Sequence, residues 1–204
     1  MSHIKNIIFD LGGVLLNIDI KRTQEHFKNL GVHNIEEYFR FGHGAGAFID
    51  YEAGLINDQQ FVESLKGMIG SSVSDQDVID SWNAMLIDFP KERIEWLKEL
   101  KKKYRLFLFS NTNAIHLETF RQIYRNAHGG TSLDELFEKA YYSHLIKMRK
   151  PDLAAFEFIL KDNNLKASET AFVDDFLMNV EAARKVGIKG IHLEPGMTVL
   201  DLDL

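Results

Sequence analysis

The chain has 204 residues, of which 45% are hydrophobic and 26% are charged, so we expect one folded α/β core with a modest insertion. Its net charge of −6, with no basic run longer than the three lysines at 101–103, argues against nucleic acid as a general partner. The absence of cysteine excludes disulfides, thiolate catalysis and thiolate metal sites.

Neither a secretion signal nor a membrane span is predicted. The N-terminus lacks a charged segment followed by a long apolar stretch, and its apolar run ends at Asp10. No segment approaches the roughly 20 apolar residues that cross a bilayer. We therefore expect a cytoplasmic location and no membrane partner.

Five short apolar runs predict buried β-strands. The first, residues 7–9, ends at Asp10 and is followed by Gly12 and Gly13, which is typical of a strand closed by a tight turn. The other predicted strands are residues 106–109, 140–142, 171–173 and 190–193.

Helical patterns separate these strands. One begins after Pro90, a second begins at Pro151 and Asp152, and a third ends at Gly187, which fits a C-cap. Strands that alternate with helices predict a Rossmann-like, doubly wound, mostly parallel sheet covered on both faces. Ligands of such sheets bind where the strands end.

Residues 17–88 break this alternation, because they contain helical patterns and no convincing buried strand. We expect an all-α cap inserted after the first strand. The predicted organisation is therefore a core made of residues 1–16 and 89–204, with residues 17–88 as the cap.

Within the predicted cap, Asp19 is placed to cap a helix that runs to Gly31. Asn57 and Gln60 resemble a capping box at the start of a second helix. A further helix is indicated by Val78, Trp82 and Met85.

Polar side chains follow several of the predicted strands, and a parallel sheet would gather them at one edge. They provide three carboxylates, a hydroxyl, an amide and an ammonium. Hard oxygen ligands of this kind suit Mg²⁺ and a phosphoryl group. The residues are Asp10, Ser110, Asn111, Lys150, Asp174 and Asp175.

These residues lie in four motifs that resemble those of haloacid dehalogenase superfamily hydrolases with a C1-type helical cap. The motifs are residues 9–15, 110–112, 149–152, and 173–175 with Asn179. Residues 51–54 ahead of Phe61 resemble part of the cap. The resemblance spans nearly the whole chain and implies a hydrolase.

The resemblance implies a phosphatase that acts on a small phosphorylated metabolite. Asp10 would attack phosphorus to form an aspartyl-phosphate, which water then hydrolyses. Mg²⁺ would be held by Asp10, the backbone carbonyl of Gly12, and Asp175 with or without Asp174.

The same resemblance implies a phosphate-binding set. Ser110 and the backbone at Asn111 would hydrogen-bond the transferred oxygens, next to Gly12 and Gly13. Lys150 would neutralise charge on Asp10 and on the phosphoryl group, and Asn179 would orient the acidic loop.

One position departs from the usual phosphatase pattern, because Gly12 stands where a second Asp acts as general acid and base. Losing such a group typically lowers the rate by about 10²–10⁴. A sugar-phosphatase-like branch shares this Gly, so we favour a substrate with an easily expelled leaving group, such as a hexose 1-phosphate.

Two alternatives remain. A dehalogenase also lacks the second Asp but needs no metal, and the paired Asp174 and Asp175 argue against it, because they require a cation between them and Asp10. A catalytically silent binding protein is the other. The oligomeric state is not predicted.

Other candidates are assigned structural roles. His116 follows the second motif, but a surface or packing role is the better hypothesis. The stretch 42–46 lacks the context of a nucleotide-binding glycine loop. Nothing in the spacing of Tyr51 and Glu52 separates substrate contact from packing.

Overall fold

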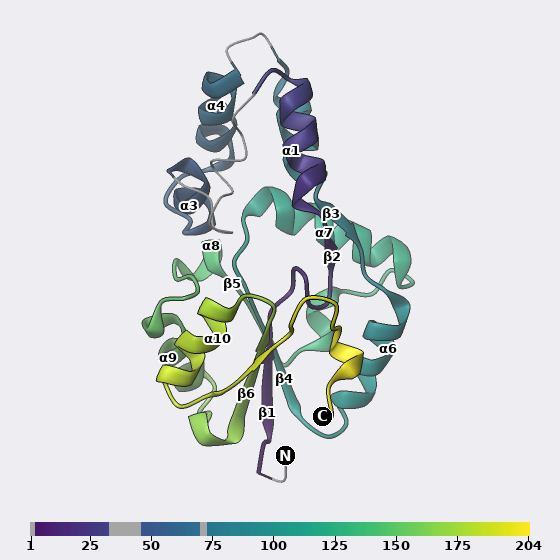
Figure 1. Ribbon diagram of the computed structural model, residues 1–204, viewed down its shortest axis with the longest axis vertical. Helices are drawn as coiled ribbons and strands as arrows, with labels where there is room; N and C mark the ends of the chain where they lie inside the picture. Colours follow the sequence, from purple (N-terminus) through teal and green to yellow (C-terminus); the bar gives the residue numbers. More distant parts are fainter. Residues whose placement is uncertain (1–2, 33–45, 70–72) are drawn as a thin grey trace.

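The central sheet has five parallel strands in the order β5-β4-β1-β6-β7. Figure 1 shows it in the lower half of the molecule. The computed structural model describes residues 3–32, 46–69 and 73–204. The strands are β1 (Asn6–Phe9), β4 (Arg105–Ser110), β5 (Lys139–Tyr142), β6 (Thr170–Asp174) and β7 (Lys189–His192). All five predicted strands and the doubly wound fold are confirmed.

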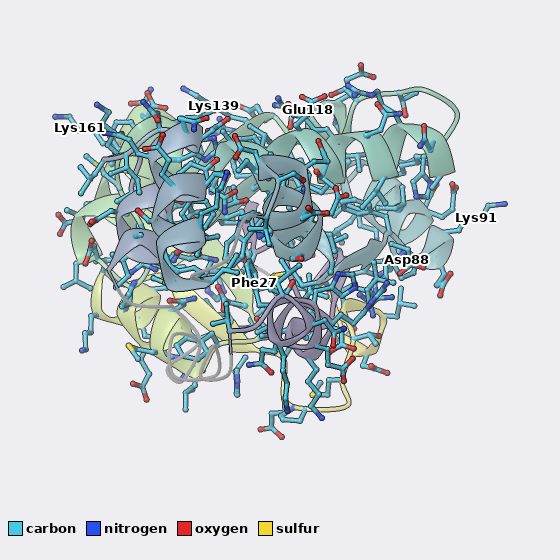
Figure 2. The ribbon with its side chains drawn as sticks, turned by 90° about the horizontal axis from the view of Figure 1, so that it is seen from above. Phe27, Asp88, Lys91, Glu118, Lys139 and Lys161 are labelled. Atoms are coloured by element: carbon cyan, nitrogen blue, oxygen red, sulfur yellow. The ribbon has the colours of Figure 1, made fainter. Side chains whose placement is uncertain are left out.

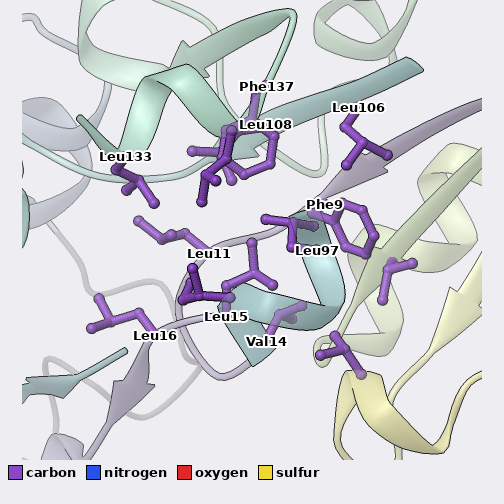
Figure 3. Close-up of a cluster of buried hydrophobic side chains, with 14 of the residues drawn as sticks. Phe9, Leu11, Val14, Leu15, Leu16, Leu97, Leu106, Leu108, Leu133 and Phe137 are labelled. Carbon is purple, nitrogen blue, oxygen red and sulfur yellow. The ribbon is translucent and has the colours of Figure 1, made fainter. Parts of the chain in front are cut away.

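Helices cover both faces of this sheet. Successive residues of a strand point to opposite sides, so apolar side chains on both faces pack against helices. Ile7 and Phe9 of β1 pack in the cluster that contains Leu97, whereas Ile8 packs with Phe156. Figure 3 shows Phe9 and Leu97 close together within the first cluster. The covering helices are α6 (Lys91–Leu100) and α7 (Ala114–Ala127) on one face, and α9 (Leu153–Asp162) and α10 (Leu177–Lys185) on the other.

Three of these helices begin or end as the sequence predicts. Pro90 is the N-cap of α6 and Asp152 is the N-cap of α9. Gly187 follows α10 with a φ of 85°, a conformation that glycine adopts without strain. The chain between β4 and α9 adds α7, which was not predicted, and the short helix α8 (Ser143–Ile146). Single 3₁₀ turns occur at Leu133–Leu136, Ala167–Glu169 and Val199–Asp201.

The insertion after β1 contains helices that stand above the carboxyl ends of the strands (Figure 1). Those described are α1 (Ile20–Asn29), α3 (Ala47–Glu52), α4 (Asp58–Ile69) and α5 (Asp75–Asn83). Asp19 caps α1 by accepting from the Lys21 amide, and Asn57 and Gln60 form the reciprocal capping box. Met85 lies beyond the end of α5 rather than within it.

A short antiparallel ribbon connects this insertion to the core. It pairs β2 (Asn17–Ile18) with β3 (Leu86–Asp88), and Asn17 donates to the Asp88 carboxylate at 2.8 Å. Neither strand was predicted. Both are short and only partly buried, so they lack the apolar signal of a core strand.

The inserted helices have a hydrophobic cluster of their own, which includes Phe27, Phe61 and Trp82. Ile115 of α7 joins this cluster and so links it to the core. In Figure 2, which is seen from above, Phe27 lies inside the outline of the molecule, whereas charged side chains such as Lys91 extend outward at the rim. Within the described residues, no helix has the length and apolar character needed to cross a membrane.

Candidate active site

Asp10 lies where β1 ends and the chain turns sharply. Its amide donates to the Val173 carbonyl at 2.9 Å, which continues the parallel pairing with β6. Gly13 follows with a φ of 76°. A Cβ atom at Gly13 would lie 2.1 Å from Oδ2 of Asp175, so only glycine lets the two loops approach this closely.

Lys150 joins the ends of two strands through its buried ammonium group. Its Nζ donates to Oδ1 of Asp10 at 2.6 Å and to Oδ2 of Asp174 at 2.8 Å. Burial disfavours the charge on Lys150, but the two carboxylates outweigh it and raise the pKa of the ammonium. Lys150 therefore stays protonated at neutral pH.

The backbone of Lys150 is fixed by the side chain of Asn111. The Asn111 amide donates to the Lys150 carbonyl, and its side-chain oxygen accepts from the Lys150 amide, both at 2.9 Å. The predicted phosphate-binding residue Asn111 thus uses its side chain to position Lys150.

Asp174 and Asp175 end β6, but they have different surroundings. Asp174 is fully buried and accepts from the Phe176 amide at 2.7 Å and from the Asn179 amide group at 3.1 and 3.2 Å, besides Lys150. Asp175 is more exposed and reaches back over Gly13. This arrangement orients Asp174 toward Lys150.

The carboxylates of Asp10, Asp174 and Asp175 meet at one point, where an oxygen of each lies within 4.8 Å of the others. Burial raises the pKa of Asp10 to about 8; Lys150 opposes this, and Asp174 and Asp175 raise it further. Burial, together with Asp174, raises the pKa of Asp175 to about 6. Such a cluster fits a hard divalent cation, which would hold all three groups ionised.

Ser110 ends β4 beside this cluster, and its side chain is buried. The hydroxyl lies 3.5 Å from the Asn111 carbonyl, at the limit of a hydrogen bond. A phosphoryl oxygen could therefore accept from Ser110 without displacing a strong partner. Gly12 lies opposite, and a Cβ atom there would come 3.3 Å from Cδ1 of Ile18.

A cavity of about 240 Å³ lies over these groups, between the strand ends and the inserted helices. Every predicted site residue except Gly13 lines it. Its remaining lining residues are Leu11, Leu16, Ile18, Ile20, Phe48, Glu52, Trp82, Met85, Leu86, Thr112, His116, Phe120, Phe176 and Asn179.

His116 and Glu52 are cavity residues for which the sequence patterns indicate no firm role. The His116 ring stacks on Trp82 with centroids 4.5 Å apart, and its Nδ1 lies 2.9 Å from the Asn83 side-chain oxygen. Burial lowers the pKa of His116 to about 3, so the ring is neutral. The only feature of the sequence that placed His116 near the site was its position six residues after Ser110.

Glu52 connects the inserted helices to the core, because its carboxylate lies 2.6 Å from the Arg149 guanidinium. Its neighbour Tyr51 has a packing role, donating to Asp58 at 2.7 Å and accepting from the Ile115 amide. Most of the glycine-rich stretch, residues 42–45, lies outside the described residues.

The chain is similar in sequence to known hydrolases and phosphatases. The sequence profile of haloacid dehalogenase-like hydrolases matches residues 4–187. D-ribitol-5-phosphate phosphatase from Bacteroides thetaiotaomicron is 28% identical over 95% of this chain and 93% of its own length. Sesquiterpene phosphatase astK from Aspergillus oryzae is 32% identical over 94% of this chain and 91% of its own.

Solved structures agree with the sequence matches. An HAD family enzyme from Bacteroides thetaiotaomicron, solved as an alanine variant in complex with magnesium and inorganic phosphate, superposes with a TM-score of 0.90. It is 35% identical and covers 95% of this chain and 96% of its own. A dehalogenase structure superposes with a TM-score of 0.65 at 16% identity, which shows a shared fold alone.

Proposed function

Because the chain belongs to the haloacid dehalogenase-like hydrolases, we propose that it is a magnesium-dependent phosphomonoesterase acting on a small phosphorylated metabolite. The observation that carries this proposal is the convergence of three carboxylates and the buried Lys150 ammonium at one end of a cavity. Residues 1–16 and 89–204 would form the catalytic core, and residues 17–88 the cap.

Asp10 is the nucleophile in this proposal. One of its carboxylate oxygens attacks phosphorus, the P–O bond to the substrate alcohol breaks, and an aspartyl-phosphate forms. Water then attacks this phosphorus and releases inorganic phosphate with regeneration of Asp10. The hydroxyl of Ser110 and the backbone at Asn111 donate to the phosphoryl oxygens, and Gly12 and Gly13 keep the turn next to them narrow.

Lys150 gives the nucleophile a permanent cationic neighbour. Its contacts with Asp10 and Asp174 hold the ammonium in place before substrate arrives, which is the preorganisation that stabilises developing charge. The Asn111 side chain supports this arrangement indirectly, because it fixes the backbone of Lys150.

The metal ligands in this proposal are Asp10, the carbonyl of Gly12, and Asp175, with Asp174 contributing its charge. Asp174 already accepts from Lys150 and Asn179, whereas Asp175 extends over Gly13 toward the cluster. A bound Mg²⁺ supplies the positive charge that lets an anionic nucleophile approach an anionic phosphate.

The substrate alcohol is the open part of the proposal. Gly12 provides no acid for the departing oxygen, and this favours an easily expelled leaving group, whatever the rest of the alcohol is. The names of the phosphatase relatives refer to alcohols as different as a pentitol and a sesquiterpene. Membership of the family therefore does not identify the alcohol of this chain's substrate.

A phosphate-release assay on a panel of phosphomonoesters, with Mg²⁺ and with EDTA, tests the proposal. Mg²⁺-dependent release that Asp10→Asn abolishes is the expected result, with Asp203→Asn at the exposed C-terminal end as the control. Halide release that persists in EDTA would establish a dehalogenase instead. Release from no ester under any condition would indicate a silent binding protein.

A further inference from the structure

The wall of the cavity beyond the phosphate end is predominantly apolar, and it is built by separate parts of the chain. Ile18 and Leu86 come from the two strands of the ribbon, Phe48 and Trp82 come from the inserted helices, and Phe176 follows the acidic pair. From this wall, and resting on the proposed function, we infer that the substrate is the phosphomonoester of a mainly apolar alcohol.

Apart from the predicted site residues and Asn179, three described residues with polar side chains other than Trp82 line the cavity, namely Glu52, Thr112 and His116. The Glu52 carboxylate is paired with Arg149 at 2.6 Å. Thr112 is held through its backbone, whose amide donates to the Ser143 hydroxyl at 2.9 Å and whose carbonyl accepts from that hydroxyl at 3.0 Å. Among the residues that the structure describes, these side chains are too few to replace the water around a polyol.

His116 adds little hydrogen bonding to the cavity. Its Nδ1 faces the Asn83 side-chain oxygen, and its Nε2 is buried, with no hydrogen-bond partner within the described residues. A pentitol would bring several hydroxyls, and each one left without a partner weakens binding by about tenfold.

The size of the cavity sets a limit on the alcohol. Its volume of about 240 Å³ also contains the space for the phosphate, and it lies below the roughly 300–1,000 Å³ of pockets for drug-sized ligands. The part of the apolar group that the described residues enclose is therefore short. Methylene groups gain affinity from such a wall by leaving water.

A matched pair of substrates tests whether the cavity prefers an apolar alcohol to a hydroxylated one. Pentyl phosphate and ribitol 5-phosphate both carry a five-carbon chain esterified through a primary alcohol, and they differ in their free hydroxyls. With Mg²⁺, we expect kcat/KM for pentyl phosphate to exceed that for ribitol 5-phosphate by about tenfold or more. Acetyl phosphate, whose small acyl group barely reaches the wall, reports on the phosphate end alone.

Adjacent residues of β3 supply a matched pair of variants. Leu86 lines the cavity, whereas Ile87 is 39% exposed and points to the other side of the strand. Leu86→Asn should reduce the preference for pentyl phosphate by about tenfold, and Ile87→Asn should leave it unchanged. Thermal melting of both variants verifies that they are folded.

The outcomes separate this inference from the proposed function. A preference of the wild-type protein for ribitol 5-phosphate would overturn the inference and leave the phosphatase intact. An unaltered preference in folded Leu86→Asn would also overturn it. Mg²⁺-independent or absent hydrolysis of these three compounds and of every other ester in the panel would overturn the proposed function and the inference together. The wild-type comparison decides the matter even if Leu86→Asn does not fold.

Discussion

The Nζ atom of Lys150 lies 2.6 Å from Oδ1 of Asp10, although the two residues are 140 positions apart in the sequence. The same atom lies 2.8 Å from Oδ2 of Asp174. Their side chains are almost completely buried, so this ammonium has been removed from water and depends on the two carboxylates. The contact therefore matters for folding as well as for the proposed chemistry.

Replacing Lys150 tests both roles. Lys150→Met leaves two buried carboxylates without their cation, so we expect unfolding to become easier by about 3 kcal/mol in the absence of Mg²⁺. We also expect kcat for phosphate release to fall by about 10³-fold. Chemical denaturation and steady-state assays measure the two effects. Lys161→Met on the exposed side of α9 is the control, and an equal loss in both variants would contradict a specific role.

The two acidic residues of the fourth motif should respond differently to neutralisation. Asp175→Asn removes a proposed metal ligand that lies over Gly13, so the Kd for Mg²⁺ should rise by about 100-fold or more with little loss of stability. Asp174→Asn weakens contacts with Lys150 and Asn179, so it should also lower Tm.

Calorimetric titration with Mg²⁺ and thermal melting without Mg²⁺ separate these two predictions. The ligand assignment would be wrong if Asp174→Asn impaired Mg²⁺ binding more than Asp175→Asn while leaving Tm unchanged. Asp201→Asn is not a suitable control, because Asp201 belongs to a capping box with Thr198. Asp203→Asn near the exposed end serves instead.

The positions of the charged groups could be predicted because each follows a recognisable apolar run. Residues 7–9 and 171–173 are continuous hydrophobic segments, typical of strands covered on both faces, and carboxylates come directly after them. Parallel pairing of β1 with β6 then places Asp10 beside Asp174. The alternation of strands and helices predicted that these groups gather at one edge of the sheet, and the structure adds that β1 and β6 are neighbours.

The contacts that refine the site could not be predicted, because they depend on tertiary packing. No local pattern indicates that the Asn111 side chain holds the backbone of Lys150. The ribbon residues Ile18 and Leu86 lie in strands too short and too exposed to show periodicity. The stacking of His116 on Trp82 likewise joins segments that are far apart along the chain.

Stability without metal should depend on pH in a defined direction. Burial raises the pKa of Asp10 from 3.8 to about 8 and that of Asp175 to about 6, so the folded state binds more protons than the unfolded chain between these values. The free energy of unfolding should therefore decrease as pH rises from about 4 to 8. We expect Tm in EDTA to be several degrees lower at pH 8.5 than at pH 6.

Two comparisons identify the carboxylates as the cause. Asp10→Asn has no charge to bury, so it should flatten this dependence and melt above the wild-type protein at pH 8.5 in EDTA. Mg²⁺ should raise the Tm of the wild-type protein most at the higher pH, because it binds the ionised cluster. A wild-type Tm that rises between pH 6 and 8.5 in EDTA would contradict the expected direction.

Restoring a carboxylate at Gly12 tests whether the missing acid limits catalysis. The backbone of Gly12 does not require glycine through a positive φ, and an added Cβ would meet only Ile18, whose Cδ1 atom at 3.3 Å can shift. Gly12→Asp should therefore fold. If departure of the alcohol is slow, kcat for pentyl phosphate should rise by at least about tenfold, toward the 10²–10⁴ typical of a positioned general acid.

The leaving group and a second variant provide the controls for this experiment. Acetyl phosphate releases acetate, which needs no proton, so Gly12→Asp should change its kcat far less than that of pentyl phosphate. Gly12→Asn has nearly the same size but cannot donate a carboxyl proton, and it should accelerate neither reaction. Equal rates for the two variants with pentyl phosphate would mean that another group or water already supplies the proton, and that the absent carboxylate does not limit this enzyme.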